Sequence, residues 1–524
     1  MDARSEAQGI PGKTIGRITI DNRDIFDPTD PSESKWIYRA ANVLHIQTND
    51  SVIRLELLFK EGDPYDPDLI EETERNLRRF KFLRRVRITT EEHPDGVVDV
   101  VVHTKDTWTL EPQFNFSRVG NKSTTKMGIV ERNLLGTGKR MGAFIHRRPD
   151  GTHNSFSYKD QQFLGRKMSL TGDYLSGTDF RQYGASLSKF FSSSQSKNSF
   201  EISNFFNEEV LPAYRDGHEV GQFETESRQA VFLLGRSFGS TTKMTRQGTV
   251  AYRHETRKYE PVSGDTVGFL KPPLALSVVE LGADWKELDF IKERHIEKFD
   301  RDEDFDLGAG AGFTFGVGQN WEANRRTELL PQLRGQYGHL FQPGHFVLGG
   351  AKYNSRIAND KTDNLLFSLD LQYFNRLRSR NTLAVHLAYD HGYRLDPENY
   401  LLLGEDTGLR GYGVGEFSGE RRFLFNLEDR MFFAEDVLHL FSLGGAVFFD
   451  SGYSWNPENT MGLSDLRSSV GIGFRVALSR SSRNEPIRFD LAYALNNNDQ
   501  NSRLVFSIQS GLKFGGLDEE RTKR

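Results

Sequence analysis

The sequence predicts a mainly β protein, a transmembrane antiparallel β-barrel preceded by one small α/β unit. Three observations predict this fold class. From Trp108 onward, segments of about ten residues alternate apolar with small or polar side chains, and charged turns separate them. No long helical pattern follows Phe80. The chain also contains 40 Phe and 49 Gly among 524 residues, which suits outward-facing aromatic side chains and closely approaching strands.

The composition excludes several classes of protein. The chain has no cysteine, which removes disulfide frameworks, thiolate metal sites and cysteine nucleophiles. The net charge of −5 gives no reason to expect nucleic acid as a partner. The mean hydropathy of −0.58 is typical of a soluble protein, but it averages over a period-two pattern whose two faces meet different solvents. Residues 1–9 are polar and charged, so we expect no signal peptide in this chain.

The first hundred residues predict an α/β unit. The expected elements are a strand at 14–20, a helix at 34–43, a strand at 52–59, a helix that opens at Asp66–Pro67, and strands at 83–90 and 97–104. The helix after Pro67 is the clearest, because its apolar residues recur at helical spacing and its basic residues gather at its C-terminal end. Pro94-Asp95-Gly96 predicts the turn between the last two strands.

The remainder of the chain predicts a closed sheet. In the last segment the residues Leu504, Phe506, Ile508, Leu512 and Phe514 share one face. Such a face meets either lipid or a soluble core, and the length of alternating chain favours lipid. In lipid every backbone group must pair with a neighbouring strand, which a closed barrel allows.

Four motifs carry a resemblance to a known superfamily. They are Glu61–Tyr65 with the closing run Val98–Val102, the turn Glu131–Gly138, the segment Gly408–Tyr412, and the strand segment Phe448–Gly452. In this order they resemble the POTRA-plus-barrel outer-membrane assembly and translocation proteins. That superfamily includes the BamA/TamA family, of bacterial surface antigen type, the mitochondrial sorting and assembly barrel, and the two-partner-secretion transporters.

The resemblance implies a domain organisation and a location. It implies a single POTRA-like periplasmic domain at 14–105, an outer-membrane barrel at 106–514, and tails at 1–13 and 515–524. The resemblance implies a barrel of sixteen strands, which is the number we expect, and a direct count of candidate strands allows up to twenty. The expected location is the bacterial outer membrane, with the POTRA domain in the periplasm.

The resemblance also implies a function. The protein is expected to assist insertion, assembly or translocation of polypeptides by POTRA capture and through a lateral seam or the lumen. The expected partners are unfolded or partly folded outer-membrane clients, outer-membrane lipid and lipopolysaccharide, and periplasmic proteins at the POTRA domain. The alternatives are a barrel-anchored enzyme of lipase type and a passive pore.

The candidate site is a clamp between a loop and the inner wall. Period two puts Phe448, Asp450 and Gly452 on one face of their strand, and a buried Asp needs a partner. Arg410 on a glycine-rich loop tip can supply a bidentate guanidinium. The full candidate set is Arg410, Gly411 and Tyr412 on the loop, Phe448, Asp450 and Gly452 on the wall, and Glu428 and Arg430 as supporting polar residues. A purely structural clamp and a working part of insertion both remain open.

The candidate seam joins the first and last strands of the barrel. Trp108 and Phe114 mark the first strand, and Phe506 and Phe514 mark the last. A poorly paired junction is the element of lowest stability and therefore the one expected to open.

Other motifs are set aside. Gly235–Gly239 matches the serine-nucleophile pattern, but the following residues predict a turn and a strand instead of the required helix. We therefore expect no enzyme activity, no catalytic residue, no metal and no cofactor. The acidic cluster at 300–306 fits either a solvated loop, the favoured interpretation, or a site for Ca²⁺ or the lipopolysaccharide surface. The basic residues at 75–85 fit a solvated helix face or contact with anionic lipid.

Overall fold

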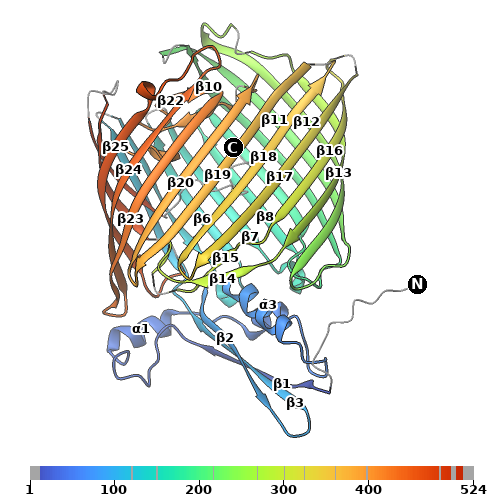
Figure 1. Cartoon of the computed structure of the whole chain (residues 1–524), viewed down its shortest axis with the longest axis vertical. Helices are drawn as coiled ribbons and strands as arrows, with labels where there is room; N and C mark the ends of the chain where they lie inside the picture. The colour runs from blue at the N-terminus through green and yellow to red at the C-terminus, as the bar shows by residue number, and fades with distance from the viewer. Residues whose placement is uncertain are drawn as a thin grey trace.

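The structure is a computed structural model in which a small N-terminal unit lies at one end of a large β-barrel (Figure 1). The described residues are 12–119, 122–148, 151–215, 218–267, 270–299, 301–323, 325–359, 361–396, 399–482, 486–496 and 503–510. Most of the expected N-terminal tail, the whole expected C-terminal tail, Asp300 and Phe514 lie outside these residues.

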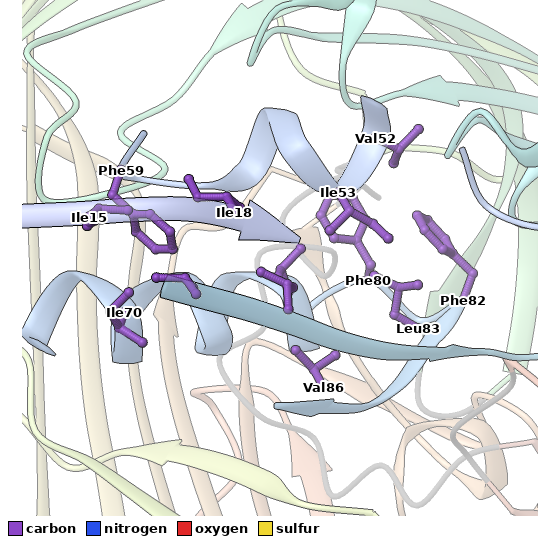
Figure 2. Packing of buried hydrophobic residues seen from close by; sticks show 13 residues of the cluster. Ile15, Ile18, Val52, Ile53, Phe59, Ile70, Phe80, Phe82, Leu83 and Val86 are labelled. Atoms are coloured by element: carbon purple, nitrogen blue, oxygen red, sulfur yellow. The ribbon is translucent and has the colours of Figure 1, made fainter. Parts of the chain in front are cut away.

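The N-terminal unit contains a three-stranded sheet. β1 (Thr14–Arg23) pairs in parallel with β3 (Val97–Asp106), which pairs antiparallel with β2 (Leu83–Glu92). Alternate residues of β3 are buried because one face of the sheet packs against helices. Figure 2 shows this core, which includes Ile15, Ile18, Val52, Ile53, Phe59, Ile70, Phe80 and Val86.

Three helices complete the unit: α1 (Trp36–Leu44), α2 (Asp50–Glu56) and α3 (Pro67–Arg78). α3 begins where the sequence predicts. The Asp66 side chain accepts a hydrogen bond of 2.9 Å from the backbone N–H of Asp68 and so caps the first turn. Leu69, Ile70 and Leu77 are buried on the predicted face.

The strand expected at 52–59 is wrong, because α2 occupies most of it. Val52 and Ile53 are both buried in the same core. Adjacent residues of a strand point to opposite faces, so a strand would have exposed one of them. A helical turn lets both side chains reach the core, and this packing outweighs the β propensity of the two β-branched residues.

Twenty of the described strands close into one barrel, in which β27 returns to pair with β4. The first ten are β4 (Leu110–Val119), β5 (Lys122–Glu131), β6 (Arg140–Arg148), β7 (Gly151–Asp160), β8 (Ser169–Gly177), β9 (Phe180–Lys189), β10 (Asn198–Arg215), β11 (His218–Ser237), β12 (Met244–Gly264) and β13 (Leu274–Glu287). The second ten are β16 (Gly310–Asn320), β17 (Arg326–Gln342), β18 (His345–Ala358), β19 (Lys361–Arg378), β20 (Asn381–Tyr393), β23 (Arg421–Val437), β24 (Phe441–Trp455), β25 (Arg467–Leu478), β26 (Ile487–Ala494) and β27 (Leu504–Ser510).

The number of strands differs from the number that the resemblance implies. The sixteen strands that the superfamily implies do not match this barrel, and the direct count of about twenty does. Several strands are much longer than a membrane requires: β11 and β12 have 20 and 21 residues, and β10 and β19 have 18 each. Since about 9–11 tilted residues cross a bilayer, these strands are long enough to extend beyond it.

The outer surface of the barrel is an apolar band. Ile202, Phe232, Tyr252, Val279 and Val317 lie in direct register on five successive strands, and each is exposed by 46–53%. The same alternation continues around the barrel. Soluble monomers rarely expose a contiguous apolar surface of this extent, which is typical of the lipid-facing side of a membrane barrel. Among the described residues, no helix has the length and apolar character needed to cross a membrane.

Candidate functional site

The loop between β20 and β23 lies inside the barrel. It carries two short paired strands, β21 (Leu401–Leu403) and β22 (Phe417–Gly419). The buried loop residues Leu403, Leu409 and Tyr412 pack with Leu424 of β23 and Ala494 of β26. The loop tip therefore contacts the inner wall of the barrel on the side of the last strands.

Arg410 at the tip reaches the candidate wall residues. Its Nε donates to Asp450 Oδ2 at 2.7 Å, and its Nη2 donates to Asp450 Oδ1 at 2.8 Å. Its Nη1 donates to Glu428 Oε2 at 3.0 Å. The guanidinium carbon lies 3.5 Å from the centroid of the Phe448 ring, a cation–π contact. All four side chains are buried, so these charge-assisted bonds form away from water.

A polar network surrounds this pair. Asn426 donates from Nδ2 to Asp450 Oδ1 and to the Gly408 carbonyl, at 2.7 Å in each case. Glu428 Oε1 lies 3.4 Å from a nitrogen of Arg430 and 3.4 Å from one of Arg475, and Arg475 in turn pairs with Asp490. Each buried carboxylate thus has a cationic partner, as a desolvated charge requires.

The glycines of both motifs allow close approach. Gly411 has a φ of +94°, and a Cβ there would lie 2.9 Å from the Ser469 Cβ. A Cβ on Gly452 would lie 2.6 Å from the Phe423 carbonyl oxygen. Beside them, the Tyr412 hydroxyl donates to the Ser468 carbonyl at 3.0 Å. The predicted loop residues and wall residues therefore lie in one cluster. The loop can come this close to the wall because Gly411 and Gly452 carry no side chain.

The barrel closes where β27 pairs with β4. Three described pairs join these strands: Phe506 with Arg118, Ser507 with Ser117, and Ile508 with Phe116. Every other junction of the barrel has at least seven pairs among the described residues. Phe114 and Phe506 face outward and are 44% and 42% exposed, whereas Trp108 precedes β4 and bridges Ser481.

The motifs set aside have structural roles. Ser237 ends β11, and a turn and then β12 follow it, so the helix that a serine nucleophile needs is not there. In the acidic cluster, Asp304 and Asp306 pair with Arg78 and Lys286. The described part of the chain contains no group of three or more His, Cys, Asp or Glu placed to hold a metal ion.

Comparison with known proteins decides the nature of the N-terminal unit. Residues 45–105 match the family model described as "POTRA: Surface antigen variable number repeat". In the structure these residues directly precede a closed barrel. The chain therefore joins a POTRA-like domain to a closed β-barrel.

Two curated relatives match this chain over short segments. The "Outer membrane protein assembly factor BamA" of Neorickettsia risticii (strain Illinois) is 31% identical over 139 residues, which are 25% of the chain and 18% of the relative. A "Putative outer membrane protein assembly factor" of Treponema pallidum (strain Nichols) is 26% identical over 137 residues, 24% of the chain and 16% of the relative. The matched segments thus span less than a fifth of either relative's length.

Two solved structures are also similar. BamA from Haemophilus ducreyi lacking POTRA domains 1–3 has a TM-score of 0.37 at 15% identity, with 94% of this chain and 85% of that chain covered. CdiB from Escherichia coli has a TM-score of 0.45 at 11% identity, with 95% and 76% covered. The POTRA match at residues 45–105 and the closed barrel define the architecture of this chain.

The POTRA domain contacts the turns at one end of the barrel. In the turn that contains the motif Glu131–Gly138, Asn133 donates to the Thr48 hydroxyl at 2.8 Å, and the Gly136 carbonyl accepts from the Asn49 N–H at 2.9 Å. In one direction around the mouth, Arg480 of the β25–β26 turn donates to Glu33 at 2.6 Å, and in the other the Ser194 N–H of the β9–β10 turn donates to Glu72 at 2.8 Å. The domain therefore spans the mouth instead of extending away from it (Figure 1).

A hairpin that the sequence pattern did not predict lies across the same mouth. It consists of β14 (Phe290–Glu293), β15 (Glu303–Asp306) and their connection. Ile296 at its tip is buried against Phe346, Phe374 and Ala384, which come from β18, β19 and β20. The Phe299 ring lies 4.8 Å from that of Phe432 on β23. The tip thus packs inside the ends of four neighbouring barrel strands.

The hairpin joins the POTRA domain to the clamp. Arg78 of α3 donates two hydrogen bonds of 2.8 Å to Asp304, and Arg75 lies over the Phe290 ring at 4.1 Å. At the tip, Arg430 donates to the Ile296 carbonyl at 2.9 Å, and Arg430 also contacts Glu428 of the clamp. The basic end of α3 therefore contacts barrel residues, where the sequence analysis expected water or lipid. The connection between β13 and β16 is long for a turn at this end of a barrel, where turns are usually short, and this length could have indicated an inserted element.

Proposed function

We propose that this protein inserts, assembles or translocates polypeptides at the outer membrane of a bacterium. In this proposal the domains are those expected from the sequence: a periplasmic POTRA domain at 14–105 captures unfolded or partly folded clients, and the barrel at 106–514 passes them on. Outer-membrane lipid and lipopolysaccharide surround the barrel. The proposal includes no chemical reaction and no cofactor.

The observation that carries the proposal is the β4–β27 junction. Three described pairs join these strands, against seven or more at every other junction among the described residues. The barrel closes where its first and last strands meet, and we infer that this junction, which has the fewest described pairs, is the element of lowest local stability and opens sideways. A client strand can then pair with the freed edge of β4 or β27, because an edge strand offers unpaired backbone groups.

The capture step uses the POTRA sheet. In the order β1-β3-β2, strands β1 and β2 are the edges. An extended client segment can add to such an edge by main-chain hydrogen bonds, which are insensitive to sequence and therefore suit varied clients.

The contents of the lumen favour this function over a passive pore. The β20–β23 loop packs on the inner wall, and the β14–β15 hairpin packs across the mouth. A pore for small solutes needs a continuous water-filled channel, which both segments obstruct. We propose that Arg410, Asp450 and Glu428 hold the loop in place while the seam opens, so that the barrel keeps its shape on the wall beside the seam.

A disulfide lock tests the proposal. Because the chain has no native cysteine, F116C/I508C places one cysteine pair across the seam, where Phe116 and Ile508 are in register. M127C/I145C places a matched pair across the regular β5–β6 junction. The assay is insertion of an urea-unfolded eight-stranded outer-membrane barrel into proteoliposomes that contain the variant, scored by protease protection.

We expect the oxidised seam lock to abolish insertion and a reductant to restore it, while the oxidised M127C/I145C variant inserts at the unmodified rate. Full activity of the oxidised seam variant would overturn lateral opening.

A further inference from the structure

The helix α1 exposes its apolar side. Trp36, Val43 and Leu44 are 74%, 84% and 73% exposed, and Ile37 and Ile46 are about half exposed. At about 3.6 residues per turn, Trp36, Val43 and Leu44 share one side of the helix. Tyr38, on the opposite side, is buried. α1 is thus an amphipathic helix whose apolar side faces away from its own domain.

The inner side of α1 fixes the helix to the rim of the barrel. The Tyr38 hydroxyl donates to the Leu438 carbonyl, in the turn between β23 and β24, at 2.8 Å. Tyr38 also shares a cluster with Leu440 from the same turn and with Trp108, which directly precedes β4. α1 therefore lies beside the mouth on the side of the barrel that contains the seam (Figure 1).

The exposed apolar side continues onto exposed apolar residues of the barrel rim. Leu438 is 65% exposed beside the Tyr38 contact. At the other end of the helix, Ile46 Cγ2 lies 3.5 Å from the position of a Cβ on Gly136, and the adjacent Leu135 is also 65% exposed. Above this rim begins the band that the barrel presents to lipid. The surface is therefore continuous with a lipid-facing one.

The charges beside this side of α1 fit a phospholipid surface. Lys35 at the helix start and Arg39 one turn on are exposed. Apolar and aromatic side chains that enter the acyl boundary, with basic residues at headgroup level, are the pattern of a helix that lies in the membrane interface. We propose that α1 inserts its apolar side into the periplasmic leaflet next to the β4–β27 seam and so anchors the POTRA domain to lipid.

This lipid anchor is a separate property from the capture and insertion of client polypeptides, and it does not depend on them. The barrel turns hold the POTRA domain through polar contacts such as that between Arg480 and Glu33. The lipid contact adds a second attachment at the point where a client would leave the barrel.

Site-specific fluorescence tests the proposal on the full chain. With no native cysteine, V43C and L44C each take one environment-sensitive NBD label, and E91C on the exposed outer part of β2 serves as the matched control. Each protein is reconstituted into vesicles of phosphatidylethanolamine and phosphatidylglycerol, with or without nitroxide-labelled phosphatidylcholine. Because the three positions are exposed, the folded barrel should persist, which its altered mobility on unheated gels verifies.

We expect nitroxide lipid to quench the labels at 43 and 44 several-fold more than the label at 91, with blue-shifted emission at 43 and 44. Equal, weak quenching at all three positions would overturn the proposal. Disulfide-linked dimers of unlabelled L44C, without quenching of the labelled protein, would assign this side of α1 to a second copy and overturn it as well. Neither result depends on the seam lock, so this proposal and the proposed function can fail separately.

Discussion

Removing the Arg410 side chain should destabilise the barrel strongly. In R410A, Asp450 loses two charge-assisted hydrogen bonds of 2.7 and 2.8 Å, and Glu428 loses one of 3.0 Å. Both carboxylates are buried, at 0% and 1% exposure. Leaving a buried charge without its partner costs about 3–5 kcal/mol. The loss of the cation–π contact with Phe448 adds about 1–2 kcal/mol.

The assay is urea unfolding of the purified protein in detergent, followed by gel mobility and tryptophan fluorescence. The control is R334A, because Arg334 also makes two hydrogen bonds to one carboxylate, that of Asp284, but is 62% exposed. An exposed pair contributes about 0–1 kcal/mol. R410K should fall between the two, since lysine keeps the charge without the bidentate geometry. An R410A protein that unfolds at the same urea concentration as R334A would refute the clamp.

The remaining predictions concern the hairpin and the loop tip. R78E should open the mouth, because its new charge repels Asp304; planar-bilayer recordings should show several-fold more frequent openings, which the added D304R reverses. Burial raises the pKa of Glu303 to about 7 from 4.5. The stabilisation by neutral Glu303, about 3 kcal/mol, is therefore complete below about pH 4.5 and is lost as the pH rises through 7. Proteolysis of the hairpin should increase from pH 5 to pH 8. In E303Q, which cannot ionise, it should not change with pH. G411A should cost about 1–3 kcal/mol in the same urea assay because its φ is +94°, whereas G172A, with no atom within 4 Å of its Cβ, should be neutral.

Period-two alternation predicted most of the fold because each strand carries its own signal. It also put Phe448, Asp450 and Gly452 on one face, and the structure has this face inside the barrel. The count of alternating segments, about twenty, also matches the barrel, whereas the order in which the strands pair could not be predicted because closure depends on contacts between segments. It failed at Val52–Ile53, where the shared core of the POTRA domain decides the conformation.

The hairpin lay beyond local reasoning for the same reason. Arg78 and Asp304 are 226 residues apart, and each alone is typical of a solvated surface. Their pairing depends on the docking of the POTRA domain on the barrel, which no local pattern encodes. The exposed apolar side of α1 was likewise not predictable. Helical spacing shows which residues share a side, but it does not show that Tyr38 faces the barrel.

We propose that clients leave through the junction of β4 and β27. The most direct measurement is photocrosslinking during insertion, with benzoylphenylalanine in place of Phe506 on β27 or of Phe313 on β16, far around the barrel from the seam. The two residues are matched controls, since both face outward and are 42% and 46% exposed. We expect a client arrested during insertion to crosslink to position 506 and not to position 313. Equal crosslinking at both positions, or none at 506, would contradict it.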